Sequence, residues 1–488
     1  MAHPMHFASY MGHPEPVLHA AEAYHPRTPQ ESPLWNLLDR YFDQFTQLYN
    51  VRFAKDYGFF RPVVSEVVHD YLKCGDLAHG FARVRCPDCR HEFLLAFSCR
   101  GRWFCPSCHT KKVIQFGELL RENIIYPVPH RQYVFSIPII LRKYFLYDRK
   151  LLSGLCRSAH ESLLVFFRTT LGKPEGVIGT VMAIQTFGDY AKWHPHIHSL
   201  TADGLFDERG VFYCMPKTAD IQPLAELFRA NVLKILKRKG LIDDQLIAKL
   251  LKWQHTSGFS VHNGVRLARD DSKGLTAVAQ YILRNPFAQG KITFNETTGM
   301  VVYKSKMSHS KAEGGKKNFV VYPACNFIAA ITQHIPEKRC QMVRYYGWYS
   351  NKMRGERRKL EEELTAANVA ETKGDEAIEI VDVSIYKPRR IPTPTWRECI
   401  KKIWEIDPLK CPHCKAEMKI ISFISEPKLV RKILEHLKLW TTPPVSERLP
   451  PTRAAPLPDP DPSPTDEITY EPFDDGWPQY EEPFMTVN

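Results

Sequence analysis

The residues best suited to hold a catalytic ion lie in the stretch His194-Pro-His196-Ile-His198. Alternate side chains of a β-strand share one face, so His196 and His198 are expected to point the same way. Two imidazoles on one face can converge on a single divalent ion. The third ligand is open between His194 and Gln185, whose side-chain oxygen an antiparallel hairpin would bring alongside. Such a site suits Mg2+ or Mn2+ and leaves positions for phosphate oxygens.

A tyrosine on a predicted helix is the second residue that could do chemistry. Leu275 to Leu283 has helical periodicity, and Pro286 would end the helix. Tyr281 lies beside the apolar side of this helix, where a tyrosine ordinarily packs half-buried. On the helix alone, a packing role and a reactive role for Tyr281 both stay open.

Two cysteine knuckles form the most specific metal motif. Cys86-Pro-Asp-Cys89 and Cys105-Pro-Ser-Cys108 are separated by fifteen residues, a spacing typical of zinc ribbons. Each knuckle turns two thiolates toward one point, so we expect all four to hold one tetrahedral, structural Zn2+ ion. A closed site of this kind leaves no position for substrate. Four nearby residues could substitute for one of these ligands or hold a second ion, and the sequence does not decide between these roles: Cys74, His79, Cys99 and His109.

A third knuckle, Cys411-Pro-His-Cys414, stands by itself, with Cys399 twelve residues before it. It is either half of a second zinc site that a distant cysteine or histidine completes, or a degenerate remnant.

The elements that must position these residues alternate between two periodicities. Helical patterns are found at Ile221–Lys239 and Leu275–Leu283, and strand patterns at Gln132–Pro138, Val177–Gln185, His196–Thr201 and Val301–Lys304. This alternation predicts an α+β domain of about 200 residues. Two short helices are expected before the cysteine-rich region.

Composition shifts give the expected domain boundaries. The interval 74–112 is rich in Cys and Arg, 360–395 is charged and then Pro-rich, and 441–488 is acidic and contains twelve prolines. The expected sequence of segments is a flexible arm (1–34), N-terminal helices (35–73), a zinc-binding module (74–112), the α+β domain (113–330), a basic aromatic helical segment (331–359), a linker (360–395), a small module with one Cys-x-x-Cys (396–440) and a disordered acidic tail (441–488).

Charge points to a polyanionic partner. The chain of 488 residues has a net charge of +12, and its last 48 residues contain ten acidic but only two basic side chains. The rest therefore holds 64 basic against 44 acidic residues, a net charge of +20, which favours nucleic acid. A composition of 44% hydrophobic and 25% charged residues excludes collagen-like, fully disordered and disulfide-rich mini-protein classes. No window approaches about 18 uninterrupted apolar residues, so we expect a cytoplasmic protein that binds no membrane.

Together these motifs resemble the HUH endonuclease superfamily, in which a His-hydrophobic-His strand holds a divalent ion and a helix presents a nucleophilic tyrosine. More narrowly, they are similar to the rolling-circle bacterial transposases of the insertion-sequence-ninety-one group. The residues that carry the resemblance are the knuckles at 86–108, Gln185-Thr-Phe-Gly, His194-Pro-His196-Ile-His198, the Tyr281 helix and Arg344-Tyr345-Tyr346-Gly347.

The resemblance implies an HUH-type antiparallel sheet flanked by helices, with His196 and His198 as metal ligands and Tyr281 as nucleophile. Attack by Tyr281 on DNA would give a 5′-phosphotyrosine and a free 3′-OH, and the reverse step would rejoin strands without ATP. Positions four residues before and after Tyr281 hold Ala277 and Asn285, so the chain resembles a single-tyrosine member. A scheme with two tyrosines would then need a second protomer, as in a homodimer, or reuse of Tyr281.

Further residues and partners follow from the same resemblance. Single-stranded element ends and target DNA are the expected substrates. No phosphate-binding loop of an ATP-driven motor is found in the sequence, so unwinding would fall to host helicase and replication proteins on the bacterial nucleoid. Candidate phosphate contacts are Arg284, Lys304 and Lys306, and candidate base-stacking residues are Tyr345, Tyr346, Trp348 and Tyr349.

Two other classes of protein fit parts of the pattern. A plasmid replication initiator or relaxase would use the same chemistry at a replication or transfer origin. A non-catalytic zinc-ribbon DNA-binding protein would have the histidines in structural roles. The zinc motif and the missing motor favour the transposase over the initiator, and a covalent DNA adduct would distinguish either enzyme from a binding module.

Overall fold

A computed structural model describes Tyr24 and residues 28–101, 103–252, 258–304, 318–364, 379–389 and 391–440. The expected acidic tail and most of the expected N-terminal arm lie outside these residues. The end of the expected flexible arm is helical instead, with a short 3-10 helix at Pro29–Glu31 and a long helix that begins at Pro33. Within them the chain is a mixed α+β protein with antiparallel sheets, as the sequence predicts. No described helix is long and apolar enough to cross a membrane.

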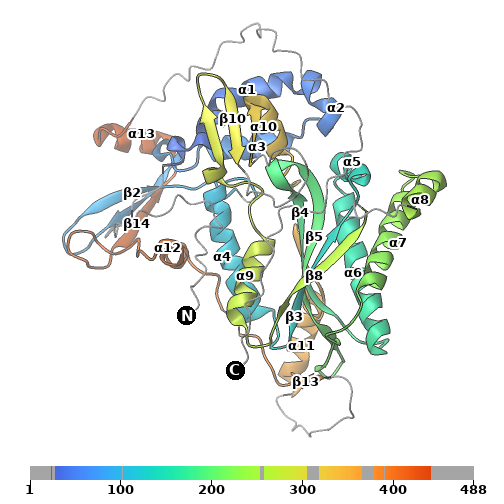
Figure 1. Ribbon diagram of the computed structural model, residues 1–488. Helices are drawn as coiled ribbons and strands as arrows, with labels where there is room; N and C mark the ends of the chain where they lie inside the picture. Colours follow the sequence, from blue (N-terminus) through green and yellow to red (C-terminus); the bar gives the residue numbers. More distant parts are fainter. Residues whose placement is uncertain are drawn as a thin grey trace, which may run out of the picture.

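A five-stranded antiparallel sheet forms the centre of the molecule (Figure 1). Its strand order is β12 (Val343–Gly347), β4 (Gly179–Phe187), β5 (Trp193–Ala202), β3 (His130–Ser136) and β8 (Ser260–Leu267). Every residue of β4 is buried, because helices cover both faces of the sheet. The strand pattern in the sequence is accordingly apolar almost throughout rather than alternating.

The two faces of this sheet support separate cores. On one face Ile184 and Ile197 pack with α6 (Leu151–Leu171) and α7 (Gln222–Arg238). On the other, Ala183 and Leu200 pack with α4 (Pro106–Asn123) and α9 (Ser272–Ile282). Figure 1 shows these two helix pairs on opposite sides of the sheet. The flanking helices α5 (Ile139–Tyr147) and α8 (Asp244–Leu251) complete the α6–α7 side.

Helix α9 is fixed at both ends by its sequence. The side chain of Asp271 accepts a hydrogen bond from the backbone N–H of Gly274 at 2.7 Å and caps the first turn. The helix ends at Ile282, four residues before Pro286. Val278, Ala279 and Ile282 are buried against the sheet, so Tyr281 lies at the border of the buried face.

A second layer caps one end of the central sheet (Figure 1). It contains the helices α1 (Pro33–Arg52), α2 (Ala54–Tyr57), α3 (Pro62–Leu72) and α10 (Ala324–Thr332), and the sheet of β9 (Ile292–Asn295), β10 (Met300–Lys304) and β11 (Phe319–Pro323). These elements share one hydrophobic core that includes Phe45, Val68 and Phe327. Where the sequence predicts two short helices, the structure has three, of which α1 is long.

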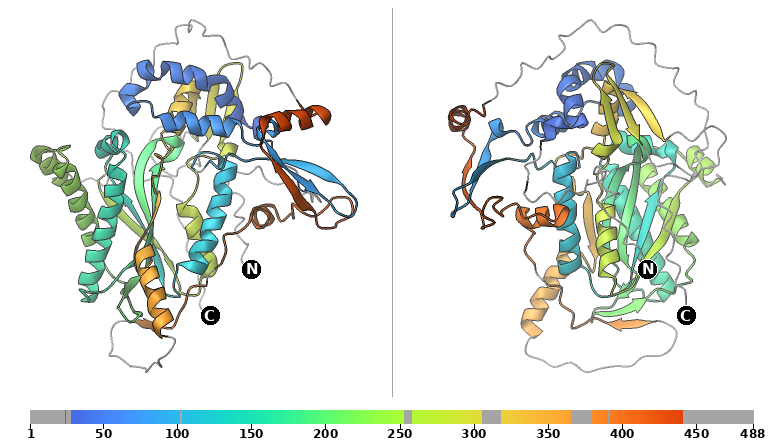
Figure 2. Two further views of the ribbon diagram at one scale, coloured as in Figure 1. Left: turned by 180° about the vertical axis from the view of Figure 1, so that it is seen from behind. Right: turned by 60° about the vertical axis from the view of Figure 1, so that its left-hand side comes forward.

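A small sheet projects from the rest of the molecule (Figure 2). Its strand order is β14 (Lys419–Ile424), β1 (Phe81–Arg85) and β2 (Glu92–Ala96). Helices α12 (Trp396–Trp404) and α13 (Pro427–His436) flank it. Strands more than 300 residues apart in the chain are therefore neighbours here.

The prediction of a helical segment at 331–359 is wrong in part. Val343–Gly347 is strand β12, which pairs with β4 at the edge of the central sheet, and α11 (Asn351–Leu364) follows it. Aromatic and β-branched residues fit a pleated, half-buried surface, and the open edge of β4 supplies the pairing. A further small sheet contains β6 (Gly204–Phe206), β7 (Val211–Cys214) and β13 (Ile380–Asp382), so three residues of the expected linker are strand.

Candidate active site

The β4–β5 hairpin places the predicted ligands on one face of the sheet. Gln185 stands directly opposite His196 in the ladder, and Ala183 stands opposite His198. His196 and His198 share a face with Leu200, which packs toward α4 and α9. All three histidines of this strand are buried. The hairpin expected from the sequence is therefore present, and it faces the tyrosine helix.

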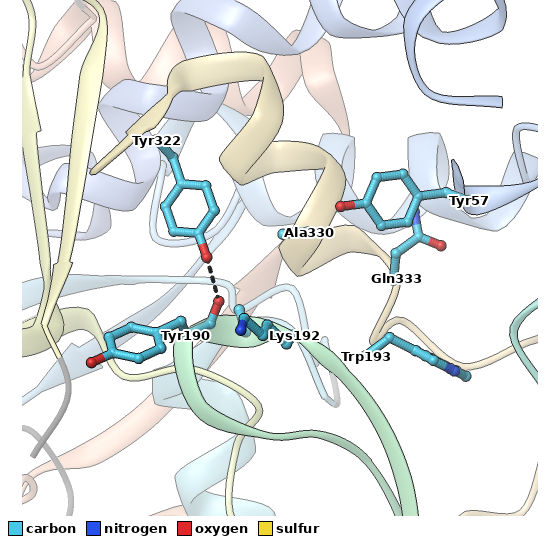
Figure 3. Close-up of a pocket in the computed structure, with 8 residues that line it drawn as sticks. Tyr57, Tyr190, Lys192, Trp193, Tyr322, Ala330 and Gln333 are labelled. Atoms are coloured by element: carbon cyan, nitrogen blue, oxygen red, sulfur yellow. Dashed lines mark hydrogen bonds between the residues drawn. The ribbon is translucent and has the colours of Figure 1, made fainter. Parts of the chain in front are cut away.

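The turn of this hairpin is held from outside. Tyr190 and Ala191 both adopt left-handed backbone conformations, with φ of 56° and 57°, which are costly for residues other than glycine. The hydroxyl of Tyr322 donates to the carbonyl of Tyr190 at 2.8 Å, and Nε2 of His334 donates to that of Ala191 at 2.9 Å. Figure 3 shows the first of these bonds beside a cavity of about 270 Å³. The capping layer thus fixes the turn that aligns Gln185 with His196.

Hydrogen bonds orient both imidazoles. Nδ1 of His196 donates to the carbonyl oxygen of His194 at 2.7 Å, so its Nε2 carries the lone pair in the neutral ring. This Nε2 lies 3.1 Å from Nε2 of His198. Nδ1 of His198 lies 3.0 Å from Nε2 of Gln132 on β3, which donates to it in this orientation of the amide. With the amide turned over, the Gln132 oxygen would instead accept the Nδ1 proton of His198 and leave both Nε2 lone pairs to one ion.

The histidines are neutral at physiological pH. Burial lowers the pKa of His196 to about 3, and it lowers the pKa values of His194 and His198 well below the usual value. Mutual repulsion among the rings and the charge of Arg284 act in the same direction on His198. A neutral imidazole offers a lone pair to a cation, which is the state a metal ligand requires.

Gln185 supplies an oxygen that matches a metal ligand. Its Nε2 donates to the carbonyl of Ile282 at 2.9 Å, and this bond fixes the orientation of the amide. Its Oε1 is buried and has no hydrogen-bond partner within the part of the chain that the structure describes. A buried acceptor left in this way costs roughly 1–3 kcal/mol, a cost that a bound cation would remove. The donor set of two imidazoles and one oxygen therefore fits a divalent ion.

His194 is the other candidate for the third position. Its ring lies 4.9 Å from that of His196, centroid to centroid. Among the described residues, the nitrogens of His194, His196 and His198 do not form a group that lies within 4.8 Å of one another. The three histidines alone therefore do not form a compact ligand group, and the third position stays open between Gln185 and His194.

Tyr281 meets the histidine pair directly. Its ring contacts that of His198 edge-on, with the ring centroids 5.6 Å apart and the planes at 86°. The guanidinium of Arg284 lies 4.8 Å from the centroid of the Tyr281 ring and 5.3 Å from that of Phe187. Tyr281 is partly exposed as a residue, whereas its hydroxyl oxygen is buried. Phenol, imidazoles and guanidinium are thus gathered at the C-terminal end of α9.

The predicted DNA-contact residues are scattered by comparison. Lys304 is exposed at the end of β10, and Lys306 lies outside the described residues. Tyr345 and Tyr346 are half-buried on β12, where Tyr346 stacks on His160 of α6 with ring centroids 4.4 Å apart. Tyr346 therefore packs on the sheet face opposite the histidine pair.

The prediction that Trp348 and Tyr349 stack on DNA bases is wrong. Trp348 and Tyr349 retain 4% and 0% of their exposed surface, so neither can stack on a base. Aromatic clusters close to a strand end pack into the core, and these two rings pack against Phe206 and Tyr126.

The cysteines form two groups rather than one. Ligand atoms within 4.8 Å of one another define an inner cysteine group of Cys74, Cys99, Cys105 and Cys108, and an outer cysteine group of Cys86, Cys89, Cys411 and Cys414. Each group offers the four thiolates that a structural zinc ion requires. The prediction that Cys86, Cys89, Cys105 and Cys108 share one ion is therefore wrong. The two knuckles lie at opposite ends of β1 and β2, and each completes its group with other cysteines.

Sequence reasoning missed the positioning residue Gln132, because its partner His198 lies on another strand and no local pattern in the sequence marks the pair. Cys74 and Cys99 were among the four residues that the sequence offered as substitute ligands or as ligands of a second ion. The structure places these two with Cys105 and Cys108, whereas His79 and His109 belong to neither cysteine group.

Comparisons with known proteins agree with this architecture. A family model described as "Putative transposase" matches residues 179–357, and one described as "Transposase zinc-binding domain" matches residues 41–137. The chain is 26% identical over 436 residues to the transposase for insertion sequence element IS801 of Pseudomonas savastanoi pv. phaseolicola, covering 85% of this chain and 94% of that protein. It is 24% identical over 302 residues to "Putative transposase y4qJ" of Sinorhizobium fredii, covering 58% and 73% of the two chains. No solved structure matches.

Proposed function

Since this chain belongs to the IS91 family of transposases, we propose that it cuts and rejoins single strands of DNA through a covalent bond to Tyr281. The observation that carries the proposal is the edge-on contact between the rings of Tyr281 and His198, 5.6 Å apart. A phenol beside two neutral, buried imidazoles matches the pairing of nucleophile and metal ligands in HUH endonucleases.

We assign some residues of the site to metal binding and others to the reaction of the tyrosine. His196, His198 and Gln185 would hold Mg2+ or Mn2+, which when bound withdraws charge from the scissile phosphate and orients it. Gln132 and the carbonyl of His194 keep the two imidazoles in the required orientation. Arg284 holds a positive charge against the Tyr281 ring, where negative charge develops as the phenol reacts.

The cleavage step exchanges one phosphorus–oxygen bond for another. The phenolic oxygen of Tyr281 bonds to the phosphorus, its proton passes to water, and the bond from phosphorus to the 3′-oxygen breaks. The leaving 3′-oxygen takes up a proton and becomes a free 3′-OH, while the 5′-phosphate stays on the tyrosine. Attack by a 3′-OH on this phosphotyrosine reverses the step and joins strands with no input of ATP.

Rolling-circle transposition follows from this chemistry. Cutting one strand exposes a 3′-OH from which host enzymes can copy and displace the strand, and the reverse step joins the displaced end to a target. The single tyrosine of α9 then acts twice, or a second protomer supplies another. Host helicase and replication proteins in the bacterial cytoplasm would complete the process at the nucleoid.

A covalent-adduct assay tests the proposal. The purified protein is incubated with labelled single-stranded oligonucleotides from the element ends and Mn2+, and the products are separated under denaturing conditions. We expect a protein–DNA adduct with the wild type and none with Tyr281→Phe, and mass spectrometry should find the phosphate on Tyr281. A control variant, Tyr345→Phe, should form the adduct normally.

Two outcomes would contradict the proposal. Absence of an adduct with a wild-type protein that still binds the oligonucleotide would favour a non-catalytic DNA-binding module. An adduct on another residue would move the nucleophile away from α9. Element ends with a hairpin and a short fixed target sequence in the flanking DNA would separate the transposase from a replication initiator.

A further inference from the structure

The outer cysteine group joins two parts of the chain that are far apart in sequence. Cys86 and Cys89 lie between β1 and β2, whereas Cys411 and Cys414 precede β14. The matched zinc-binding family model ends at residue 137 and so contains only the first pair. We propose that these four cysteines bind a second structural zinc ion, which fastens the C-terminal segment 396–440 to the N-terminal domain.

The two knuckles have the same backbone conformation. The N–H of Cys86 donates to the carbonyl of His91 at 2.8 Å, and the N–H of Cys411 donates to that of Ala416 at 2.8 Å. The residue after the second cysteine is left-handed in both cases, with φ of 64° at Arg90 and 63° at Lys415. A repeated, costly conformation at two unrelated places indicates a common task. In a zinc knuckle that task is to turn two sulfurs toward one ion.

Sulfur spacing fits a metal rather than disulfides. Sγ of Cys86 lies 3.4 Å from Sγ of Cys414, and Sγ of Cys89 lies 3.5 Å from Sγ of Cys411. A disulfide needs about 2.05 Å, and all four cysteines are free. Four sulfurs at about 2.3 Å from a tetrahedral zinc ion lie about 3.8 Å apart. A small expansion of the group is therefore enough to admit the ion.

Packing alone gives this region little stability. The core around the outer cysteine group has four buried members, Val84, Cys86, Cys411 and Met418, and two of these are themselves ligands. The neighbouring core beneath α13 has only Phe81, Ile424, Val430 and Leu434. Modules with cores this small usually depend on a metal or on disulfides. Zinc at the outer group would supply the missing restraint, because it ties β14 to β1 and β2 at one end of the sheet.

The outer ion should also be the more labile of the two. Cys89 and Cys414 are exposed, whereas three ligands of the inner group are buried and the fourth is half-buried. A chelator or an alkylating reagent reaches exposed thiolates first. We therefore expect the zinc of the outer group to leave before that of the inner group.

Site-resolved alkylation of the full-length wild-type protein tests this assignment. The zinc-loaded protein is treated with N-ethylmaleimide at increasing chelator concentration, and each cysteine is quantified by mass spectrometry. Two zinc ions per chain are expected at the start, with all eight grouped cysteines protected. Cys86, Cys89, Cys411 and Cys414 should then become modified together, with loss of one zinc ion, before the inner group reacts. Deuterium exchange should increase in β14 and β1 at the same step, and stay unchanged in α9.

Variants provide the matched comparison. The double change Cys411→Ser and Cys414→Ser should lower the zinc content from two to one and accelerate exchange in β14 at least tenfold. Cys340→Ser, at a half-buried cysteine outside both groups, should retain two zinc ions. If the double variant fails to fold, the alkylation series on the wild-type protein still tests whether the outer cysteine group binds zinc.

Three results would overturn the proposal. One is rapid alkylation of Cys89 and Cys414 in a protein that holds a single zinc ion. Another is iron instead of zinc in the metal analysis. The third is simultaneous release of both ions with no separate change in β14. None of these measurements requires DNA, so their outcome is independent of the proposed strand cleavage.

Discussion

Gln185 and His196 stand directly opposite each other in the β4–β5 ladder, and the same glutamine donates a hydrogen bond to the carbonyl of Ile282 at the end of α9. Its side chain thus connects β4, the strand paired with the histidine strand, to the helix that carries Tyr281. Its amide nitrogen bonds to the helix end, and its amide oxygen is buried without a hydrogen-bond partner among the described residues. This arrangement makes Gln185 both a proposed ligand and a positioning residue, and the two roles can be separated by substitution.

Gln185→Glu should keep metal binding, whereas Gln185→Leu should weaken it. Glutamate retains an oxygen for the ion but loses the donor to Ile282, while leucine removes both. We expect the Mn2+ concentration for half-maximal adduct formation to rise about tenfold or more in Gln185→Leu, a loss of about 1.4 kcal/mol or more. Titration of cleavage with Mn2+ measures this directly.

The competing ligand provides the control for this experiment. His194→Gln should change the half-saturating Mn2+ concentration by less than threefold if Gln185 completes the site. A large increase in His194→Gln together with an unchanged Gln185→Leu would assign the third position to His194 instead.

Gln132 should act through His198 rather than on DNA. Its amide lies 3.0 Å from Nδ1 of His198, and its side chain is buried on β3. Loss of such a partner typically weakens metal binding or activity 10- to 100-fold. We therefore expect Gln132→Leu to raise the Mn2+ requirement by about this factor, and Gln132→Glu to restore binding, because a carboxylate accepts the Nδ1 proton. An equal loss of adduct formation in both variants, with no change in the Mn2+ concentration required, would mean that Gln132 only packs in the core.

Several of these relationships were accessible from the sequence and others were not. The histidine face and the place of Gln185 follow from strand alternation and from a hairpin between neighbouring segments, so local rules are sufficient. The partner of Gln132 lies 66 residues away, and no periodicity reports which strand will be adjacent. Tertiary pairing likewise made Val343–Gly347 a strand, since the edge of β4 accepts it.

The zinc ligands show the same limit more sharply. Spacing marked the two knuckles at 86–108 as zinc-binding motifs, in agreement with the matched zinc-binding family model, because a Cys-x-x-Cys pair requires only local geometry. Which knuckles share an ion depends on the path of the whole chain. Cys86 and Cys411 are separated by more than 300 residues but meet in one group, whereas Cys89 and Cys105, only sixteen residues apart, belong to different groups.

Acid should destabilise the protein through buried histidines away from the site. Burial lowers the pKa of His130 to about 4, below its usual value near 6.5 in the unfolded chain. The unfolded state then binds more protons between these pH values, so stability is fully present above pH 6.5 and falls as the pH drops toward 4. The contribution is about 1.4 kcal/mol per pH unit at most. The hydrogen bond from His130 to the Val128 carbonyl acts in the opposite direction but is outweighed by burial.

Urea unfolding between pH 4.5 and 7.5 measures this effect. His130→Gln should flatten the pH dependence of the unfolding free energy, although it lowers the stability overall. His69→Gln, at an exposed histidine, is the control and should keep the wild-type dependence. The same slope in His130→Gln as in the wild type would assign the acid sensitivity to other groups.

Asp203 should be among the most sensitive structural residues of the central domain. Its carboxylate is fully buried and pairs with Arg131 at 3.2 Å and with Arg266 at 2.7 Å, so it joins the ends of β3 and β8 next to β5. Removal of one partner from a buried charge group typically costs about 3–5 kcal/mol, because uncompensated charges remain in the interior. We expect Asp203→Ala to lose this amount in urea unfolding. Arg209→Ala, which breaks the exposed pair with Asp207, should cost less than about 1 kcal/mol. A loss in Asp203→Ala no larger than in Arg209→Ala would mean that water reaches both arginines, and that the β3–β8 ladder is stable without the buried ion pairs.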